Sequence, residues 1–291
     1  VLARLPEVGE VMALTRNEAC VHELTGRFNP PEIEGAMGQV VGEIDLRLFL
    51  RGWAFGYMLD EETRSGPRRS LQFFDATGMA VHKVYATQGT DAEAFGRIVA
   101  DFAEDGAAPA RFAAPAVRAV DRPDAEIDVA GLRAAWEGLG HTHEFFALLR
   151  RFKVGRGQAM RLAGPALAQP APPGAARDVL ERAAAAELPV MVFVGNAHCV
   201  QIHSGPVRRI EVMGPWVNVL DPKFNLHLRE DRIAAAWVAR KPSVNGDIHS
   251  LELYDADGDV IAQVFGLRVA GGRELPEWRA LVTGLAEAAP C

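Results

Sequence analysis

Two kinds of hydrophobic pattern alternate along the chain. Residues 46–51 read Leu-Arg-Leu-Phe-Leu-Arg, and this alternation predicts a half-buried strand. Residues 190–194 form a short, continuous apolar run, which predicts a buried strand. Asp75 and Asp255 each open an Asp-x-x-Gly sequence, which is typical of a turn between adjacent strands. Together these features predict antiparallel sheet.

Stretches with apolar residues at helical spacing separate and follow the predicted strands. Residues 90–93 (Thr-Asp-Ala-Glu) form a capping box with Thr90 as its cap, ahead of apolar positions spaced for a helix to Phe102. Pro276 opens a similar stretch near the carboxyl end. Further helices are expected over residues 132–152, 158–162 and 178–187, and looser chain is expected over 106–130 and 169–174.

The same pattern occurs twice, at a spacing of about 180 residues. Residues 70–78 (Ser-Leu-Gln-Phe-Phe-Asp-Ala-Thr-Gly) align with residues 250–258 (Ser-Leu-Glu-Leu-Tyr-Asp-Ala-Asp-Gly). Further matches follow in the same order, and one of them aligns Asn17 with Asn196. Because the copies are only two and are long, the repeat indicates a duplicated domain rather than a solenoid.

These patterns predict an α+β fold with an internal duplication. We expect two large antiparallel sheet halves, flanked by helices, and a helical middle segment. The amino-terminal repeat is expected over residues 1–105, the linker and central helices over 106–189, and the carboxy-terminal repeat over 190–291. A chain of 291 residues is long enough to bury a sizeable core.

Composition narrows the classes of function. The 31 basic and 38 acidic residues give a net charge of −7, so we expect neither nucleic acid nor an anionic membrane as a partner. No apolar run reaches the ~18 residues of a membrane-spanning helix, and no signal peptide is visible. The 3 cysteines do not form a disulfide framework, so a cytoplasmic protein is expected. The chain starts abruptly at Val1, and we expect a leading segment to be missing.

Common catalytic motifs are absent from the sequence. It contains no Gly-x-Gly-x-x-Gly, no Walker lysine loop, no Gly-x-Ser-x-Gly and no Cys-x-x-Cys. These absences count against nucleotide-dependent and acyl-transfer enzymes.

The two histidines at 141 and 143 form the sharpest local feature. Thr142 is predicted to cap the helix that follows, which places His143 in the first helical turn. The positive end of a helix keeps an imidazole neutral, and the neutral form is the one that binds metals. Phe145 and Phe146 nearby would suit a large, flat, apolar ligand. On this motif alone, however, two exposed histidines at a helix start are the favoured interpretation.

Two other groups of residues have alternative interpretations. His198, Cys199 and His203 could form the zinc site of a hydrolase, but Cys199 aligns with Cys20, which has no neighbouring histidine and favours a packing role. Arg47 and Arg51 share a predicted strand face with aromatic residues. That face is either a solvated sheet edge or one wall of a pocket for an anionic aromatic ligand.

Several long stretches resemble one family of proteins. Residues 8–17 (Val-Gly-Glu-Val-Met-Ala-Leu-Thr-Arg-Asn), 45–49, 70–75 with 82–85, and 237–242 are similar to the cytoplasmic haemin-degrading and haemin-trafficking family (HemS/ChuS/HmuS/PhuS). The resemblance covers essentially the whole chain, including its duplication. It implies two similar halves, with haem held in a cleft that involves the central helices. Members usually carry a further helical segment at the amino end, which we expect this chain to lack.

The resemblance also implies a set of site residues. The proximal iron ligand of the family lies in a His-x-Phe-Phe element, which His143 begins here, and His141 would be an alternate ligand. A strand arginine acts on the distal side of the haem through water, and Arg47 and Arg51 both fit. The remaining implied contacts are Arg156 and Lys241 on the propionates, Gln263 and Arg268 as weaker candidates there, and Met191 and Phe193 in the apolar lining.

The implied function belongs to bacterial haem uptake. The protein would open the haem ring oxidatively to release iron, pass haem on, or do both. An external electron donor would be needed, because the sequence has no flavin or nicotinamide motif. The alternative is a pure haem chaperone that delivers haem to a separate haem oxygenase. An inner-membrane haem transporter or a haem oxygenase is the implied partner, and the protein is expected to be a monomer or a homodimer.

Overall fold

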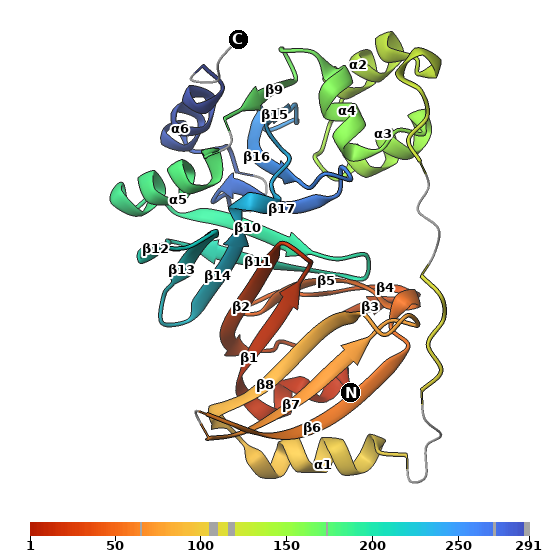
Figure 1. Cartoon of the computed structure of the whole chain (residues 1–291), viewed down its shortest axis with the longest axis vertical. Helices are drawn as coiled ribbons and strands as arrows, with labels where there is room; N and C mark the ends of the chain where they lie inside the picture. The colour runs from red at the N-terminus through yellow and green to blue at the C-terminus, as the bar shows by residue number, and fades with distance from the viewer. Residues whose placement is uncertain (65, 105–109, 116–119, 173, 270–271, 288–291) are drawn as a thin grey trace. The chain divides into compact units, whose positions relative to one another are not determined.

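The structure of the protein is a computed structural model that describes residues 1–64, 66–104, 110–115, 120–172, 174–269 and 272–287 (Figure 1). The predicted connector at 106–130 lies partly outside these ranges, and Cys291 lies wholly outside them. Within these ranges there are four 3₁₀ helices: η1 (Leu2–Val8), which precedes the first strand, η2 (Leu50–Gly52), η3 (Asp124–Glu126) and η4 (Glu230–Arg232).

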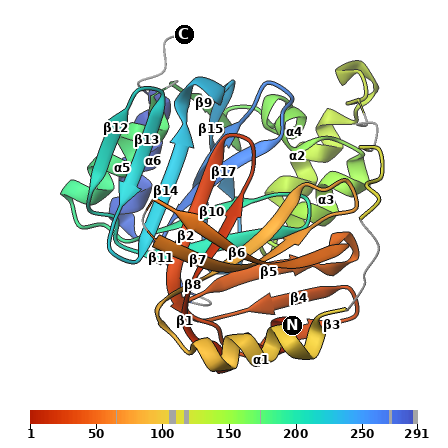
Figure 2. The same ribbon diagram turned by 60° about the horizontal axis from the view of Figure 1, so that its bottom comes forward.

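The first copy of the repeat forms strands and one closing helix. Its elements are β1 (Gly9–Arg16), β2 (Cys20–Arg27), β3 (Glu32–Glu34), β4 (Met37–Val40), β5 (Asp45–Phe49), β6 (Phe55–Thr63), β7 (Gly66–Phe74), β8 (Ala80–Thr90) and α1 (Ala92–Phe102). Figure 2 shows α1 along one face of the first-copy strands, where Phe95 and Ile98 join their hydrophobic core.

The middle segment and the second copy follow in the same way. The middle segment contains α2 (Val129–Glu137), α3 (Glu144–Phe152), α4 (Arg156–Ala163), β9 (Ala168–Ala171) and α5 (Ala175–Ala185). The second copy contains β10 (Val190–Gly195), β11 (Cys199–Gly205), β12 (Ile210–Met213), β13 (Trp216–Leu220), β14 (Phe224–Arg229), β15 (Ala235–Lys241), β16 (Ile248–Tyr254), β17 (Val260–Gly266) and α6 (Pro276–Glu287).

The strands of the described chain form two large antiparallel sheets. The first has eight strands in the order β12-β13-β14-β2-β1-β8-β7-β6, and the second has nine in the order β3-β4-β5-β11-β10-β17-β16-β15-β9. Each sheet therefore contains strands of both copies, because β3–β5 join second-copy strands and β12–β14 join first-copy strands. The predicted α+β fold with duplicated antiparallel halves is confirmed.

Contacts divide the chain into two compact units, and neither unit is continuous in sequence. Unit 1 contains Val1–Val117, Phe193–His203 and Asp221–Leu226, and unit 2 contains Arg118–Val192, Ser204–Leu220 and His227–Cys291. The three-part division at residues 105 and 189 describes the repeat rather than these units, and it stays a prediction.

The turns that follow β7 and β16 have the same geometry in both copies. In each turn the aspartate, Asp75 or Asp255, accepts hydrogen bonds at Oδ1 from the backbone N–H groups two and four residues later, at 2.8–3.0 Å. Gly78 and Gly258 have φ of 85° and 79°, which is left-handed backbone that favours glycine. The Asp-x-x-Gly sequence thus forms the same turn twice, as the pattern predicts.

Asn17 and Asn196 form a second matched pair, and they lie within unit 1. Each Oδ1 accepts hydrogen bonds from the backbone N–H groups two and three residues later, at 2.9–3.1 Å. Asn17 Nδ2 donates to the carbonyl of Gly195 at 3.0 Å, and Asn196 Nδ2 donates to the carbonyl of Arg16 at 3.1 Å. The two copies therefore exchange the same hydrogen bond in both directions.

Three local predictions differ from the structure. Asp91, not Thr90, caps α1 and accepts from Ala94 N at 2.9 Å, because the Thr90 hydroxyl donates to a carbonyl of β1. The helix predicted over 132–152 is two helices, α2 and α3, since the glycines at 138 and 140 favour a break. The predicted break at 169–174 contains β9, which tolerates a proline because it is an edge strand.

The core of unit 1 contains buried histidines. His22 and His82 are almost fully buried, and the Nδ1 of His82 lies 2.8 Å from the Thr15 hydroxyl. Burial lowers the pKa of both imidazoles to about 3, and the nearby His203 adds to the effect at His22. Both side chains are therefore neutral in the folded protein at pH values where the unfolded chain binds a proton.

We expect acid to destabilise the protein through these two histidines. A lowered pKa means that their stabilising effect is complete above the unfolded pKa of about 6.5 and is lost as the pH falls toward the folded value. Between pH 7 and pH 5 each histidine should remove about 2 kcal/mol of unfolding free energy. Urea denaturation at both pH values should show a smaller drop for His22→Phe, and an unchanged drop for the exposed control His141→Ala. A full drop in His22→Phe would contradict this account.

Candidate functional site

One face of the second-copy strands carries a row of polar side chains. In the ladder, Glu252 of β16 lies opposite Trp237 of β15 and Gln263 of β17, and Ser250 lies opposite Phe265. Residues directly opposite in antiparallel strands share a face of the sheet. Helices α2–α4 pack on this face through a core that includes Tyr254, Trp136 and Phe145, whereas α5 and α6 lie on the other side (Figure 1).

Glu252 is the centre of a buried ionic cluster. Its carboxylate is fully buried and accepts two hydrogen bonds from Arg156, at 2.8 Å from Nε and at 3.0 Å from Nη2. Lys241, whose side chain is 2% exposed, donates to Oε1 of the same carboxylate. The hydroxyls of Tyr254 and Ser250 donate to Glu252 at 2.6 Å and 3.1 Å. One carboxylate therefore holds a cation of the middle segment and a cation of the second copy in place.

The charged groups of this cluster shift one another's pKa values. Burial alone would raise the pKa of Glu252, but the charges of Arg156 and Lys241 hold it well below its usual value. Burial lowers the pKa of Lys241, and the charge of Glu252 opposes this shift. Burial and the same carboxylate raise the pKa of Tyr254, so its hydroxyl remains a donor. The cluster is thus one anion held between two cations.

Phe145 connects the cluster to α3. Arg156 Cζ and Lys241 Nζ each lie 5.0 Å from the centroid of its ring, within the range of a cation–π interaction. Phe145 also packs on Trp136, with the ring centroids 4.5 Å apart and the ring planes at 67° to each other. The beginning of α3 is therefore fixed to the charged sheet face by an aromatic side chain.

His141 and His143 lie at the exposed beginning of α3. The cap of this helix is His143 itself, so the predicted cap at Thr142 is wrong. The reason is that the Glu144 carboxylate reaches back and accepts from the backbone N–H groups of residues 140 and 141. Both imidazoles are exposed, and Phe146 beside them is 65% exposed. The structure thus presents two histidines and an aromatic side chain at the surface, close in sequence to Phe145.

Two donors on the same half of the molecule have no acceptor among the described residues. These are Gln263 Nε2 and Arg268 Nε, both of which are buried atoms. Burial lowers the pKa of Arg268, and the charge of Glu274 opposes the shift. Buried donors in native proteins nearly always have a partner, so a bound group or a water molecule with acceptor oxygens would complete these two atoms, as it would the buried His22 imidazole of unit 1. The structure therefore brings Arg156 and Lys241 together and leaves Gln263 and Arg268 available.

Met191 and Phe193 occupy alternate positions on β10. Both side chains are half-buried, whereas Val190, Val192 and Val194 between them are buried. β10 is the neighbour of β17 in the nine-stranded sheet. Their placement in the lining of a haem cavity stays a prediction.

The two candidate distal arginines belong to unit 1. Arg47 lies on β5, where it forms an ion pair with Asp45 and donates to the carbonyl of Leu46 at 3.0 Å. Arg51 lies on the 3₁₀ helix η2 and is exposed. The predicted strand through residue 51 ends at Phe49, so the expectation that both arginines share one strand face is wrong. Their distal role stays a prediction.

The zinc hypothesis finds no support in the geometry. Cys199 is buried, and burial raises the pKa of its thiol to about 12. His203 stacks on Phe224 with the ring centroids 3.8 Å apart, and the ring of His198 lies 3.7 Å from a carboxylate oxygen of Asp75. In the ranges that the structure covers, no three His, Cys, Asp or Glu side chains converge as a metal site would require.

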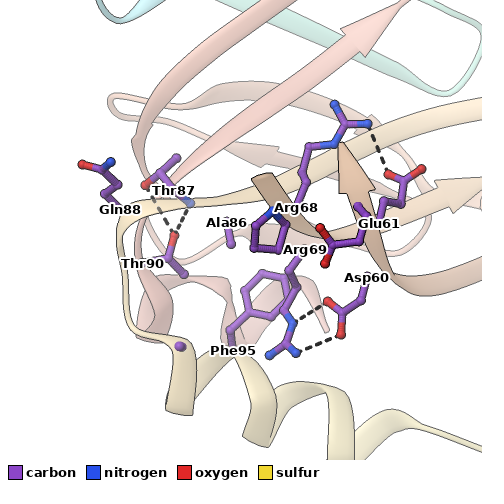
Figure 3. A pocket seen from close by; sticks show the side chains of 12 residues that line it. Asp60, Glu61, Arg68, Arg69, Ala86, Thr87, Gln88, Thr90 and Phe95 are labelled. Carbon is purple, nitrogen blue, oxygen red and sulfur yellow. Dashed lines mark hydrogen bonds and ion pairs between the residues drawn. The ribbon is translucent and has the colours of Figure 1, made fainter. Parts of the chain in front are cut away.

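A pocket in unit 1, apart from the cluster around Glu252, is lined by paired acidic and basic side chains (Figure 3). It lies between the β6–β7 hairpin, β8 and the start of α1. Arg69 donates to both carboxylate oxygens of Asp60 at 2.7 and 2.9 Å, and Arg68 pairs with Glu61 at 3.2 Å. These charges neutralise one another at an exposed surface. The pocket contains none of the residues that the sequence predicts for a site.

The sequence did not single out Glu252 and Tyr254 as site residues. They occurred only as positions of the repeat, where they align with Gln72 and Phe74. The available signal was the charge of Glu252, since a glutamate between two leucines of a buried strand requires a partner.

Among the described helices, none has the length and apolar character that a membrane span requires.

Comparisons with known proteins agree with this description. The profile of the family described as the haemin-degrading HemS.ChuX domain matches residues 1–102 and 153–285. The hemin transport protein HemS of Yersinia enterocolitica is 40% identical over 283 residues, which are 96% of this chain and 81% of that protein. Residues 103–152, which carry both candidate histidines, lie between the two ranges of the family profile, but the alignment with HemS spans nearly the whole chain.

Two crystal structures share the fold closely. Holo-PhuS, a heme-binding protein from Pseudomonas aeruginosa, has a TM-score of 0.95 and 44% identity, over 98% of this chain and 83% of that chain. ChuS, a heme oxygenase of E. coli, has a TM-score of 0.89 and 39% identity, over 98% of this chain and 85% of that chain. With this agreement in profile, sequence and structure, the protein belongs to the haemin-degrading HemS/ChuX family.

Proposed function

We propose that this protein binds haem, with His143 of the middle segment as the proximal iron ligand and His141 as an alternate ligand. The observation that carries the proposal is the pair of buried donors, Gln263 Nε2 and Arg268 Nε, for which the described residues supply no acceptor. Haem is a flat apolar disc with two carboxylates, so it needs both aromatic contacts and basic donors. The names given to HemS, PhuS and ChuS agree with haem as the ligand.

The charge of the site suits a dianion. Arg156, Lys241 and Arg268 carry three positive charges, and the buried carboxylate of Glu252 carries one negative charge. Glu274, whose charge acts on Arg268, is itself paired with Arg279, so the positive charges of these residues still exceed the negative ones, as a ligand with two propionates requires. Because Arg156 and Lys241 are already held by Glu252, we propose that they act on the propionates mainly through their charge, while Gln263 and Arg268 donate hydrogen bonds.

The residues of this chain orient the ligand and exclude water. His143 would supply a neutral imidazole to the iron, and Phe146 beside it would cover one edge of the ring. Met191 and Phe193 would line the apolar part of the cavity. Bound haem iron supplies the capacity to activate oxygen, and the distal hydrogen bond is assigned by resemblance to Arg47 or Arg51.

We propose further that haem is a substrate and that its ring is opened oxidatively to release iron in the cytoplasm. Oxygen is the oxidant, and an external donor supplies the electrons. The second candidate function is that of a chaperone that passes haem to a separate haem oxygenase. Both have support among the relatives, because ChuS is called a heme oxygenase and PhuS a heme-binding protein.

The ligand assignment predicts different effects for the two histidines. His143→Ala should shift the Soret maximum and weaken haem affinity roughly tenfold or more, equivalent to about 1.4 kcal/mol, because the iron loses its proximal ligand. His141→Ala should leave both properties close to those of the wild type. Haem titration of the three proteins checks this expectation. If only His141→Ala changes the spectrum, the two roles are exchanged.

The enzymatic proposal predicts a defined product. The haem-loaded protein, given a reductant in the presence of catalase, should lose its Soret band and yield an open-chain tetrapyrrole. Absorption spectra and chromatography of the product measure this. Bleaching that disappears with catalase would indicate damage by free peroxide instead. Little product, together with haem transfer that is faster to a haem oxygenase than to an apo-globin trap, would favour the chaperone.

The cluster predicts a specific loss of stability. Glu252→Gln should lower the unfolding free energy of the haem-free protein by about 3 kcal/mol, because the buried Lys241 and the partly buried Arg156 lose their counter-charge. Adding Lys241→Met should recover part of this loss, since one of the unpaired cations is then removed. Urea denaturation measures both effects, with the exposed Glu181→Gln of α5 as the control. A double variant less stable than Glu252→Gln would contradict this account.

A further inference from the structure

One carboxylate organises the turn that carries both histidines. Glu144 Oε2 accepts hydrogen bonds from the backbone N–H of Gly140 at 2.9 Å and of His141 at 3.3 Å. The backbone N–H of Glu144 donates to the carbonyl of His141 at 3.0 Å. Glu144 is therefore hydrogen-bonded to Gly140 and His141 through its side chain, and to His141 also through its backbone. His143 lies inside the loop that these bonds close.

The beginning of this turn is also anchored to the sheet. The carbonyl of Gly140 accepts a hydrogen bond from the backbone N–H of Val244 at 2.9 Å. Val244 lies in the connection between β15 and β16, where the Ser243 hydroxyl donates to the carbonyl of Gly246 at 2.6 Å and Gly246 N donates back to Ser243 at 3.0 Å. Gly140 is thus tied to a closed turn that directly follows the strand of Lys241.

The end of the turn is fixed by packing. Phe145 is 2% exposed and contacts both Trp136 and the two cations of the charged cluster. The chain is therefore fixed at residue 140 by Val244 and at residue 145 by burial. Between these points, Glu144 supplies the side-chain bonds that define the path of the backbone through His143.

We propose that Glu144 is the positioning residue for His143. By holding Gly140 and His141 in the closed turn, its carboxylate fixes the backbone from which the His143 imidazole projects and keeps His141 away from the same position. This inference rests on the proposed function, because it assumes that His143 is the iron ligand. It adds a residue that would not touch haem but would decide which imidazole reaches the iron.

A competing explanation for any effect of Glu144 is its charge. A carboxylate in the first turn of a helix stabilises the positive helix end whether or not it accepts these two bonds. Glutamine separates the two explanations, because its amide oxygen accepts the same hydrogen bonds and carries no charge. Alanine removes both the bonds and the charge.

The test uses haem loss and iron ligation in the whole chain. We expect Glu144→Ala to release haem to an apo-myoglobin trap about tenfold faster than the wild type and to give two ligation states by electron paramagnetic resonance. Removing the second histidine, in Glu144→Ala with His141→Ala, should eliminate one of these states. Glu144→Gln should stay within about twofold of the wild type, and Glu181→Ala of α5 should not differ from it. Wild-type release and a single state in Glu144→Ala, or identical behaviour of the glutamine and alanine variants, would overturn the proposal.

A measurement without haem separates this inference from the proposed function. Amide hydrogen exchange at residues 140 and 141 should be slow in the wild type and in Glu144→Gln, and at least tenfold faster in Glu144→Ala. Fast exchange in the wild type would overturn the role of Glu144 while leaving haem binding intact. If exchange behaves as expected but His143→Ala leaves the haem spectrum unchanged, the assignment of His143 as the ligand fails and the hold of Glu144 on the turn remains.

Discussion

The second-copy half depends on one buried carboxylate. Glu252 lies in the interior of a sheet, where an isolated charge would be very costly, and it is tolerated because Arg156 and Lys241 both pair with it. The same two cations hold the ring of Phe145, and Phe145 lies in the first turn of the helix that His143 caps. The electrostatics of the sheet and the placement of the candidate iron ligand are therefore parts of one arrangement.

The duplication supplies a framework but not a common chemistry. Both copies keep the same aspartate turn and the same asparagine turn, with equivalent hydrogen bonds. At the position of Glu252, however, the first copy has Gln72, which donates to the Ser70 hydroxyl at 3.0 Å and needs no counter-charge. Ion pairs of the first copy such as Arg69 with Asp60 and Arg68 with Glu61 are exposed, and each contributes little. The two halves thus share a fold and differ in which one can hold a buried charged site.

The family relationship and the local geometry support one another. PhuS and ChuS share the fold over nearly the whole chain, and in this chain that fold places two donors, Gln263 Nε2 and Arg268 Nε, where the described residues give them no acceptor. Fold alone would not specify a ligand, because one fold can carry many functions. The proposal that this chain binds haem is therefore supported by local features as well: positive charge, unpaired donors and a surface histidine beside aromatic side chains.

The sequence by itself determined the duplication, the antiparallel sheets, the family and the candidate histidines, because turns, strand periods and repeated motifs are local and are written in consecutive residues. Only the tertiary structure showed that β3–β5 and β12–β14 each join strands of the other copy. It also decided that Asp91 caps α1, that Glu144 displaces Thr142 as the organiser of the turn, and that Glu252 joins Arg156 to Lys241. Arg156 meets Glu252 across 96 residues of chain, and Thr90 is drawn from the cap by Glu10, which is 80 residues away; spacing along a sequence does not encode such contacts. At Glu144 the competing groups are neighbours, and the folded turn decides which of them accepts the free N–H groups.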